Sequence, residues 1–270
     1  MLDYFSYGSN MNSISLRAKG VEALASCPAC LRGWRLHFNV RHFFRHEGGV
    51  GNIEFTGVPS DYVLGVLHRC TDEALVLLDA AEAYGYGYDR IFVEVETSDA
   101  GKKLHRAATY VGMPSFIDNS CLPTRRYLNI LTAGAKEAGL ASGYIDALKK
   151  TKVQEQIVYP PFSPPLGDFP LFGAESLAKN PCCTALAGYV FDMSGATDRH
   201  TYLKQFFGGR DMTLFHLQRM DCSKGDECVE DIAAARYNAS QRAYLNTYLH
   251  EYSFEYRYAG KLDIKTGNLL

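Results

Sequence analysis

The 270-residue sequence has no excess of charge of either sign. It contains 28 Lys and Arg residues against 30 Asp and Glu residues, a net charge of −2. The balance holds within each part of the chain, with 16 basic and 16 acidic residues up to position 150, and 12 and 14 after it. A protein that binds the phosphate backbone needs a basic excess, so this balance argues against a nucleic-acid partner.

Long hydrophobic runs are missing as well. No apolar stretch approaches the roughly 18 residues of a membrane span, and the start, MLDYFSYGSNM, lacks the features of a secretory signal. We therefore expect no membrane span, a cytoplasmic location and eight cysteines that stay reduced. Cys27 and Cys30 form a C-x-x-C pair, but no second pair follows at zinc spacing, which favours ordinary thiols over a metal site.

Prolines are scarce outside one segment. Five of the ten lie between Pro160 and Pro170. Because proline fixes φ and removes an N–H donor, this run cannot continue a helix or a central strand. We therefore predict a domain at residues 1–152, a proline-rich linker at 153–170 and a second domain at 171–270.

Short strand patterns dominate before the linker. Alternating or apolar runs predict strands at 2–7, 35–39, 63–67, 90–95 and 106–111. Helical spacing with suitable end signals occurs at 71–82, 125–138 and 142–150. The pattern indicates an α+β fold with a mainly antiparallel sheet.

Two features of this part could carry chemistry. The segment YFSYGSNMN (4–12) predicts a strand that runs into a turn, where Gly8 and Ser9 could present backbone N–H groups to an anion or oxyanion. Glu82 ends an apolar helix and enters the aromatic stretch AYGYGYDR, where partial burial would raise its pKa and suit it to proton transfer. Each alone has an ordinary explanation, a simple turn and an exposed helix-end carboxylate.

Taken together, these segments resemble the γ-glutamylcyclotransferase family. The resemblance covers about residues 3–150 and rests on YFSYGSNM (4–11), GVLHRC (65–70), LLDAAE (77–82) and PTRRYLNILTAGAKEAGLASGYIDAL (123–148). It departs mildly from the family pattern at Thr124, which replaces the usual Ser, and at Ala141 and Ser142. The implied fold is a small, mostly antiparallel β-barrel with flanking helices.

The resemblance also implies a site and a reaction. The reaction releases 5-oxoproline and a free amine from a γ-glutamyl amide, because the substrate's own α-amine attacks its γ-carbonyl; neither metal nor cofactor is required. Glu82 would be the acid/base, and Ser9 and Asn10 would hold the α-carboxylate. The leaving amine stays open among γ-glutamyl amino acids, γ-glutamylamines and glutathione-derived conjugates. The implied substrate-binding residues are Tyr7, Gly8, Ser9, Asn10, Tyr88 (with Tyr86 as the alternative), Tyr110 and Tyr127.

The C-terminal part carries three further phrases, GYVFDMS (188–194), FGGRDMT (207–213) and FEYRYAGKL (254–262). They resemble the cytochrome-b5-like haem/steroid-binding domain of the membrane-associated progesterone receptor family over about 95 residues. Lys204 stands where that family has its tyrosine iron ligand; Tyr202 and His200 lie nearby, and Tyr258 matches a second haem-side tyrosine. The departure favours an α+β accessory domain, for example one that shapes the barrel entrance or forms a homodimer, over a haem binder.

These observations leave three hypotheses. The first is a γ-glutamylcyclotransferase-type enzyme with a small-molecule γ-glutamyl substrate. The second is a haem or small-lipid binding protein whose barrel serves as a scaffold, and the third is a γ-glutamyl hydrolase that releases glutamate. No catalytic role is expected for His37, His42, His46 or His68; polar or surface roles are expected for these four histidines.

Overall fold

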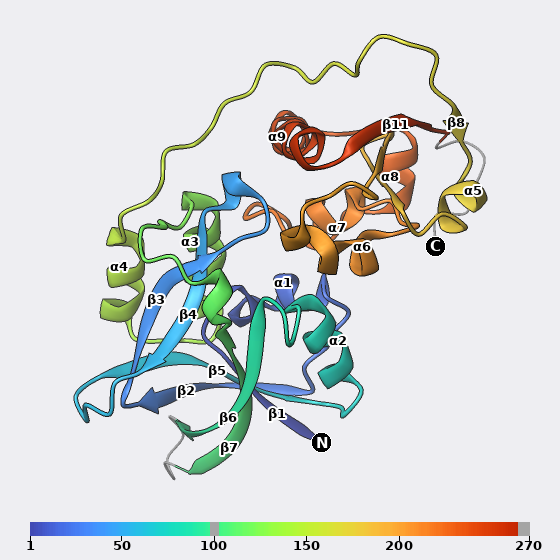
Figure 1. Ribbon diagram of the computed structural model, residues 1–270. Helices are drawn as coiled ribbons and strands as arrows, with labels where there is room; N and C mark the ends of the chain where they lie inside the picture. The colour runs from blue at the N-terminus through green and yellow to red at the C-terminus, as the bar shows by residue number, and fades with distance from the viewer. Residues whose placement is uncertain (98–102, 264–270) are drawn as a thin grey trace. The chain divides into compact units, whose positions relative to one another are not determined.

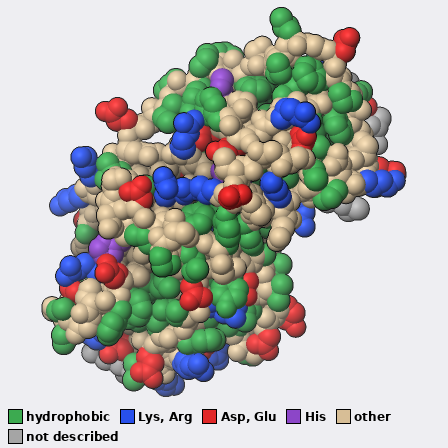
Figure 2. Space-filling view, in the orientation of Figure 1, with side chains coloured by type: hydrophobic (Ala, Val, Ile, Leu, Met, Phe, Trp, Pro, Cys, Tyr) green, Lys and Arg blue, Asp and Glu red, His purple; other side chains and the backbone are tan. Residues whose placement is uncertain are grey.

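The computed structural model describes residues 1–97 and 103–263 (Figure 1). The chain divides into two compact units, Met1–Glu155 and Gln156–Leu270. On the face shown in Figure 2, Lys and Arg side chains lie among Asp and Glu side chains. Within the described ranges, no helix is long and apolar enough to cross a membrane.

The first unit is built around a closed five-stranded barrel with the order β1-β5-β2-β6-β7. Strands β1 and β7 pair in parallel, and the other neighbouring pairs are antiparallel. The expected small, mostly antiparallel barrel is therefore confirmed. Its strands are β1 (Leu2–Ser6), β2 (Ala25–Arg32), β5 (Tyr62–Cys70), β6 (Tyr88–Thr97) and β7 (Leu104–Gly112), beside a separate pair, β3 (Trp34–Arg41) and β4 (Gly49–Phe55).

Helices flank this barrel. The helices predicted at 125–138 and 142–150 are present as α3 and α4. Thr124 caps the start of α3, where its hydroxyl accepts the Tyr127 N–H. The unit's helices are η1 (Ser9–Met11), α1 (Ser13–Arg17), η2 (Arg45–Glu47), α2 (Ala74–Ala81), η3 (Pro114–Phe116), α3 (Arg125–Glu137) and α4 (Ser142–Lys150).

Strand β2, which contains the C-x-x-C pair, was not predicted. Pro28 fits there because residues before Ala29 pair with β5 alone. Cys27 and Cys30 are three positions apart on an extended strand, so they face opposite sides and lie about 10 Å apart along the strand. The two thiols therefore cannot share a metal ion, and the described residues contain no group of three or more potential ligands.

Strand β1 separates two apolar clusters and leads into the site. Phe5 and Tyr7 belong to the cluster inside the barrel, whereas Leu2 and Tyr4 pack with Leu78 of α2. This split follows from the alternation of side chains along a strand. Tyr4 and Tyr7 therefore approach the end of β1 from opposite faces of the strand.

Helix α3 approaches the turn after β1 very closely at one glycine. A Cβ placed on Gly134 would lie 2.4 Å from the backbone N of Asn12 and from the carbonyl C of Met11. Any side chain here would displace α3 from the turn. By contrast, Gly143 in α4 has open space around its Cβ position.

We expect Gly134→Ala to destabilise the first unit by about 1–3 kcal/mol, because overpacking outweighs the gain in helix propensity. The matched control Gly143→Ala should stabilise it by up to about 1 kcal/mol. Urea titration followed by the fluorescence of Trp34, the single tryptophan, measures both. Equal effects of the two substitutions would contradict the close approach of α3.

The second unit contains a four-stranded sheet with the order β8-β11-β10-β9. Tyr248 and Tyr252 of its longest helix are buried, so their rings form part of the core of this unit. The elements are β8 (Leu171–Phe172), α5 (Ala174–Ala178), β9 (Cys183–Leu186), β10 (Tyr189–Asp192), η4 (Asp198–His200), α6 (Thr201–Phe207), α7 (Thr213–Leu217), α8 (Val229–Ala233), α9 (Ala239–Glu255) and β11 (Arg257–Leu262).

The proline-rich segment packs against α9. The Tyr159 ring stacks on His250 with ring centroids 4.7 Å apart, and its hydroxyl donates to Glu251 at 2.9 Å. The Phe162 N–H donates to the side chain of Asn246 at 2.7 Å. Residues 156–170 thus belong to the second unit rather than standing apart from both.

Candidate active site

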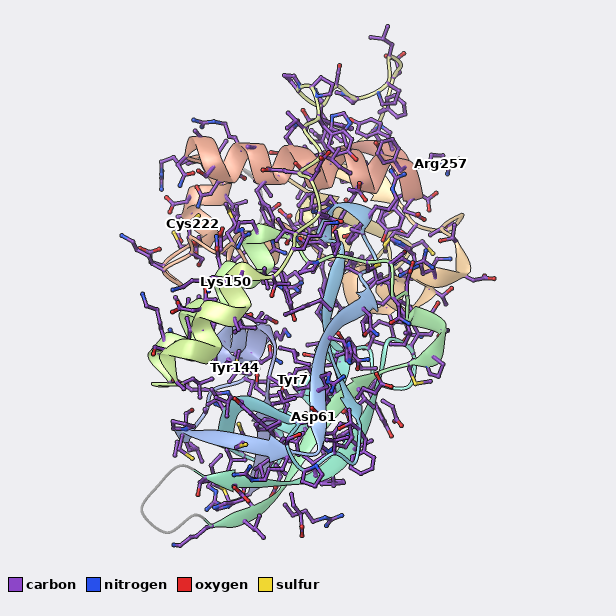
Figure 3. All side chains as sticks on the ribbon, turned by 90° about the vertical axis from the view of Figure 1, so that its left-hand side faces the viewer. Tyr7, Asp61, Tyr144, Lys150, Cys222 and Arg257 are labelled. Carbon is purple, nitrogen blue, oxygen red and sulfur yellow. The ribbon has the colours of Figure 1, made fainter. Side chains whose placement is uncertain are left out.

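A cavity in the first unit brings together the residues that the sequence singled out. Glu82 and the predicted residues of the turn line it, along with three of the predicted tyrosines. Figure 3 shows Tyr7 in the interior of this unit, where its side chain is buried. The lining consists of Tyr4, Ser6, Tyr7, Gly8, Ser9, Asn10, Gly51, Glu82, Tyr88, Tyr110 and Tyr127.

Glu82 follows α2 directly. Its N–H donates to the Leu78 carbonyl, the last helical bond, and Ala83 then takes a left-handed conformation with φ of 52°. Because a left-handed residue ends the helix at once, the chain turns away after Glu82. The side chain of Glu82 is 16% exposed, so the carboxylate is largely withdrawn from solvent.

Two side chains bind the same oxygen of this carboxylate. Glu82 Oε1 accepts from Asn10 Nδ2 at 2.9 Å and from Lys19 Nζ at 2.9 Å. Lys19 Nζ also donates to Asn10 Oδ1 at 2.6 Å, and Asn10 Nδ2 donates to the Tyr4 hydroxyl at 2.8 Å. The amide of Asn10 is therefore engaged on both sides within this network, and its side chain faces Glu82.

The turn after β1 packs against Gly51 of β4, whose backbone N–H and carbonyl are both hydrogen-bonded to tyrosine hydroxyls. The Tyr127 hydroxyl accepts the Gly51 N–H at 2.9 Å, and the Tyr88 hydroxyl donates to the Gly51 carbonyl at 2.7 Å. A Cβ on Gly8 would lie 3.1 Å from the Tyr127 hydroxyl, and one on Gly51 would lie 2.9 Å from it. Gly8, at φ of −111°, thus serves this close approach and not a left-handed turn.

The pocket tyrosines are neutral hydrogen-bond donors. Burial raises the pKa of Tyr127 to about 12 and raises the pKa of the other four further above the ordinary value; Glu82 adds to each shift. They keep their protons throughout the physiological range, so they cannot act as bases. The five are Tyr4, Tyr7, Tyr88, Tyr110 and Tyr127.

The structure distinguishes between the two candidate tyrosines after Glu82. Tyr88 lines the cavity. The ring of Tyr86 instead stacks on Phe43 at 6.3 Å and packs edge-on against Phe116 at 5.5 Å. Tyr110, the tyrosine from β7, donates to Asp79 at 2.7 Å, and that carboxylate also pairs with Arg90.

His68 supports the turn from the barrel side. Its Nε2 lies 3.0 Å from the Asn10 carbonyl and its Nδ1 lies 2.8 Å from the Ser26 hydroxyl. Because a carbonyl only accepts, Nε2 carries the proton and Nδ1 accepts from Ser26. Burial lowers the pKa of His68 to about 4, so the ring is neutral and structural, in agreement with the predicted polar role.

His37, His42 and His46 do not line the cavity. His37 lies 3.3 Å from Glu54 on a partly exposed part of β3. His46 lies beside the buried carboxylate of Glu47, which also pairs with Arg126.

The three haem-side candidates of the second unit make contacts with other protein groups. His200 is buried, and its Nδ1 lies 2.9 Å from the Tyr256 hydroxyl. Tyr258 packs edge-on against Phe169 at 4.7 Å. Tyr202, on α6, is half-buried. Lys204, at the iron-ligand position of the resemblance, donates to the Ser194 carbonyl at 3.3 Å. The polar groups of His200 and Lys204 are thus engaged with protein groups.

Four residues of the site were not predicted from the sequence. Tyr4 and Ser6 belong to the quoted motif, and alternation along β1 could have placed both at the cavity. Lys19 and Gly51 lie outside every motif, in stretches of ordinary composition. Only the closure of the fold brings them to Glu82 and Tyr127.

Comparisons with known proteins identify chains that are similar to the first unit. The profile of the AIG2-like family matches residues 56–148. The chain is 31% identical over 150 residues to human gamma-glutamylcyclotransferase, covering 54% of this chain and 76% of that protein. It is 28% identical over 155 residues to the mouse protein of the same name, covering 56% and 79%. The crystal structure of human uncharacterized protein loc79017 matches with a TM-score of 0.50 and 27% identity, covering 58% of this chain and 90% of that one.

The low pKa of His68 predicts a loss of stability in acid. The unfolded imidazole takes up a proton near pH 6.5, whereas the folded one resists protonation down to about pH 4. The stability contribution is therefore complete above pH 6.5 and is lost as the pH falls toward 4. When the pH falls from 7 to 5, the resistance of folded His68 to protonation should lower the free energy of unfolding of the first unit by about 2 kcal/mol.

Urea titrations followed by Trp34 fluorescence at both pH values test this. His68→Gln, which cannot titrate, should lose about 2 kcal/mol less than the wild type on acidification. His37→Gln is the matched control on a partly exposed strand position and should behave like the wild type. An unchanged pH dependence in His68→Gln would show that the ring is not buried in its neutral form.

Proposed function

Because this chain belongs to the γ-glutamylcyclotransferase family and is an enzyme of that kind, we propose that it releases 5-oxoproline and a free amine from a γ-glutamyl amide, with Glu82 as acid/base. The observation that carries the proposal is the single carboxylate of the described cavity lining, set among neutral tyrosine donors at the end of β1. A γ-glutamyl group needs such a base beside polar donors for its carbonyl.

The proposed reaction exchanges one C–N bond for another. Glu82 takes a proton from the substrate's α-ammonium, and the resulting amine attacks the γ-carbonyl carbon of the same molecule. The new C–N bond closes the five-membered ring, and the attacking nitrogen gives up a second proton so that it ends as the lactam N–H. Glu82 relays both protons in turn to the leaving nitrogen, whose bond to the carbonyl carbon breaks and which departs as an ammonium ion. No electrons are gained or lost overall, and holding both reacting groups in one bent substrate supplies the proximity that the step needs.

The oxyanion needs donors that are already in place. Gly8 and Ser9 of the turn line the cavity, and their backbone N–H groups are the proposed donors. The Tyr127 hydroxyl accepts from Gly51, so its own proton can be donated. We assign the α-carboxylate to Ser9 and not to Asn10, because the amide of Asn10 is engaged with Glu82, Lys19 and Tyr4.

The leaving amine stays open among γ-glutamyl amino acids, γ-glutamylamines and glutathione-derived conjugates. A cytoplasmic location, where such compounds and reduced thiols occur together, is part of the proposal.

Glu82→Gln tests the reaction. We expect the kcat/KM for release of 5-oxoproline to fall by about 10²–10⁴-fold, because the amide cannot exchange protons. The protein is incubated with γ-glutamyl amino acids, γ-glutamyl-lysine, glutathione and glutathione S-conjugates, and the products are measured by mass spectrometry. Glu94→Gln, at an exposed position of β6, is the matched control and should retain full activity.

The product decides between the hypotheses. Glutamate in place of 5-oxoproline would identify a γ-glutamyl hydrolase. Full activity in Glu82→Gln would remove Glu82 from the acid/base role. If the folded wild type releases neither product from any of these compounds, a binding protein with the barrel as scaffold would be favoured.

For the second unit, we propose an accessory domain of cytochrome-b5-like type that does not retain haem. Support comes from Lys204 at the iron-ligand position and from the protein contacts of His200 and Tyr258. We expect the purified full-length chain to show no Soret band, and titration with haemin to add only the spectrum of free haemin. A stoichiometric Soret band that disappears in Tyr258→Phe or His200→Gln would overturn this proposal and favour the haem-binding hypothesis.

A further inference from the structure

We propose that Lys19 is a positioning residue that holds Glu82 ionised through its contact with Oε1. This inference rests on the proposed function and names a residue that no motif of the sequence marks. It follows from the place of Lys19 in the fold, from its burial and from the two oxygens that it binds.

The fold fixes Lys19 against the helix that carries Glu82. Lys19 stands just after α1, where its N–H donates to the Leu16 carbonyl. Gly20 follows with φ of 77°, and a Cβ there would lie 3.6 Å from the Leu77 side chain of α2. The end of α1 thus lies against α2 and delivers the ammonium to a carboxylate 63 positions along the chain.

Burial makes this contact obligatory. The side chain of Lys19 is only 5% exposed. An ammonium taken out of water requires an opposite charge and further acceptors, and here it has Glu82 Oε1 at 2.9 Å and Asn10 Oδ1 at 2.6 Å. A residue on the surface would gain little from the same pair.

The contact determines the protonation state of the base. Burial alone favours the neutral acid, whereas an opposite charge within about 4–6 Å favours the carboxylate. With Lys19 at 2.9 Å, Glu82 is ionised and ready to accept a proton. The second donor to the same oxygen, Asn10 Nδ2, also favours the ionised carboxylate.

The other titratable groups that face Glu82 are neutral or face other partners. Burial keeps the surrounding tyrosines protonated, and His68 is neutral behind Asn10. Asp79, on the same helix as Glu82, pairs with Arg90 and accepts from Tyr110. The tyrosines are Tyr4 of β1, Tyr7 after it, Tyr88 of β6, Tyr110 of β7 and Tyr127 of α3.

The test compares Lys19→Met with Lys19→Arg. Loss of the positive charge should move the acid limb of the pH profile of kcat/KM upward by about 1–3 pH units. On the acid side this is a loss of activity of ten-fold or more. Arginine keeps the charge, so in Lys19→Arg the acid limb should lie within about half a pH unit of that of the wild type. Lys149→Met, at an exposed lysine paired with Asp146, is the matched control and should leave the profile unchanged.

A second measurement does not depend on turnover. Side-chain ¹³C NMR, with Glu82→Gln to assign the signal, follows the ionisation of Glu82 in the folded full-length variants, whose folding is checked by Trp34 fluorescence. The Glu82 titration should move upward in Lys19→Met and be restored in Lys19→Arg. An unmoved titration and an unmoved acid limb in folded Lys19→Met would overturn the inference. A shifted titration in a chain that releases no 5-oxoproline would sustain the role of Lys19 and refute the proposed reaction.

Discussion

The buried carboxylate of Glu82 is the constraint on which the rest of the site depends. A charge withdrawn from water must find an opposite charge and hydrogen bonds, or the fold loses several kcal/mol. Lys19 and Asn10 meet that requirement on a single oxygen. They come from the turn after β1 and from the end of α1, so the pairing joins both to the end of α2. The shape of the turn after β1 is in this sense a consequence of where the charge is buried.

Around this charge, the protein places donors that do not ionise. Five buried tyrosine hydroxyls give the cavity polarity without adding a second base or a second charge. Two of them, on Tyr127 and Tyr88, bind the backbone of Gly51 from either side, which fixes β4 against the turn. Tyr88 uses its proton on the Gly51 carbonyl, whereas Tyr127 accepts from the Gly51 N–H and keeps its own proton for another acceptor. A donor held in this way needs no reorganisation when charge develops on a carbonyl, and that is the main requirement for stabilising an oxyanion.

Much of the barrel and of the site could be predicted from the sequence, because strand alternation and contiguous motifs are local signals. The strands around Phe5 and Tyr110 follow from the alternation of apolar and polar residues. Strand β2 was missed because Pro28 and the C-x-x-C pair interrupt that pattern. Lys19 and Gly51 could not be found, since an ordinary lysine and an ordinary glycine gain their roles only through contacts distant in sequence. Asn10 was found by its motif, but its partner was not: the motif suggested a substrate carboxylate, and the fold presents Glu82.

The same network also explains how, in the proposed reaction, one residue would serve as base and then as acid. Pairing with Lys19 makes Glu82 a weaker base but a stronger acid, so the proton taken from the substrate is readily returned to the leaving amine. While Glu82 holds that proton, the ammonium of Lys19 loses its counter-charge. Its bond of 2.6 Å to Asn10 Oδ1 does not depend on the charge of Glu82, so the cation keeps an acceptor at this stage. Asn10 therefore supports both protonation states of Glu82, and this requirement explains why an amide suits this position. A carboxylate here would compete with Glu82 for the proton. A hydroxyl could not reach the three partners Tyr4, Glu82 and Lys19.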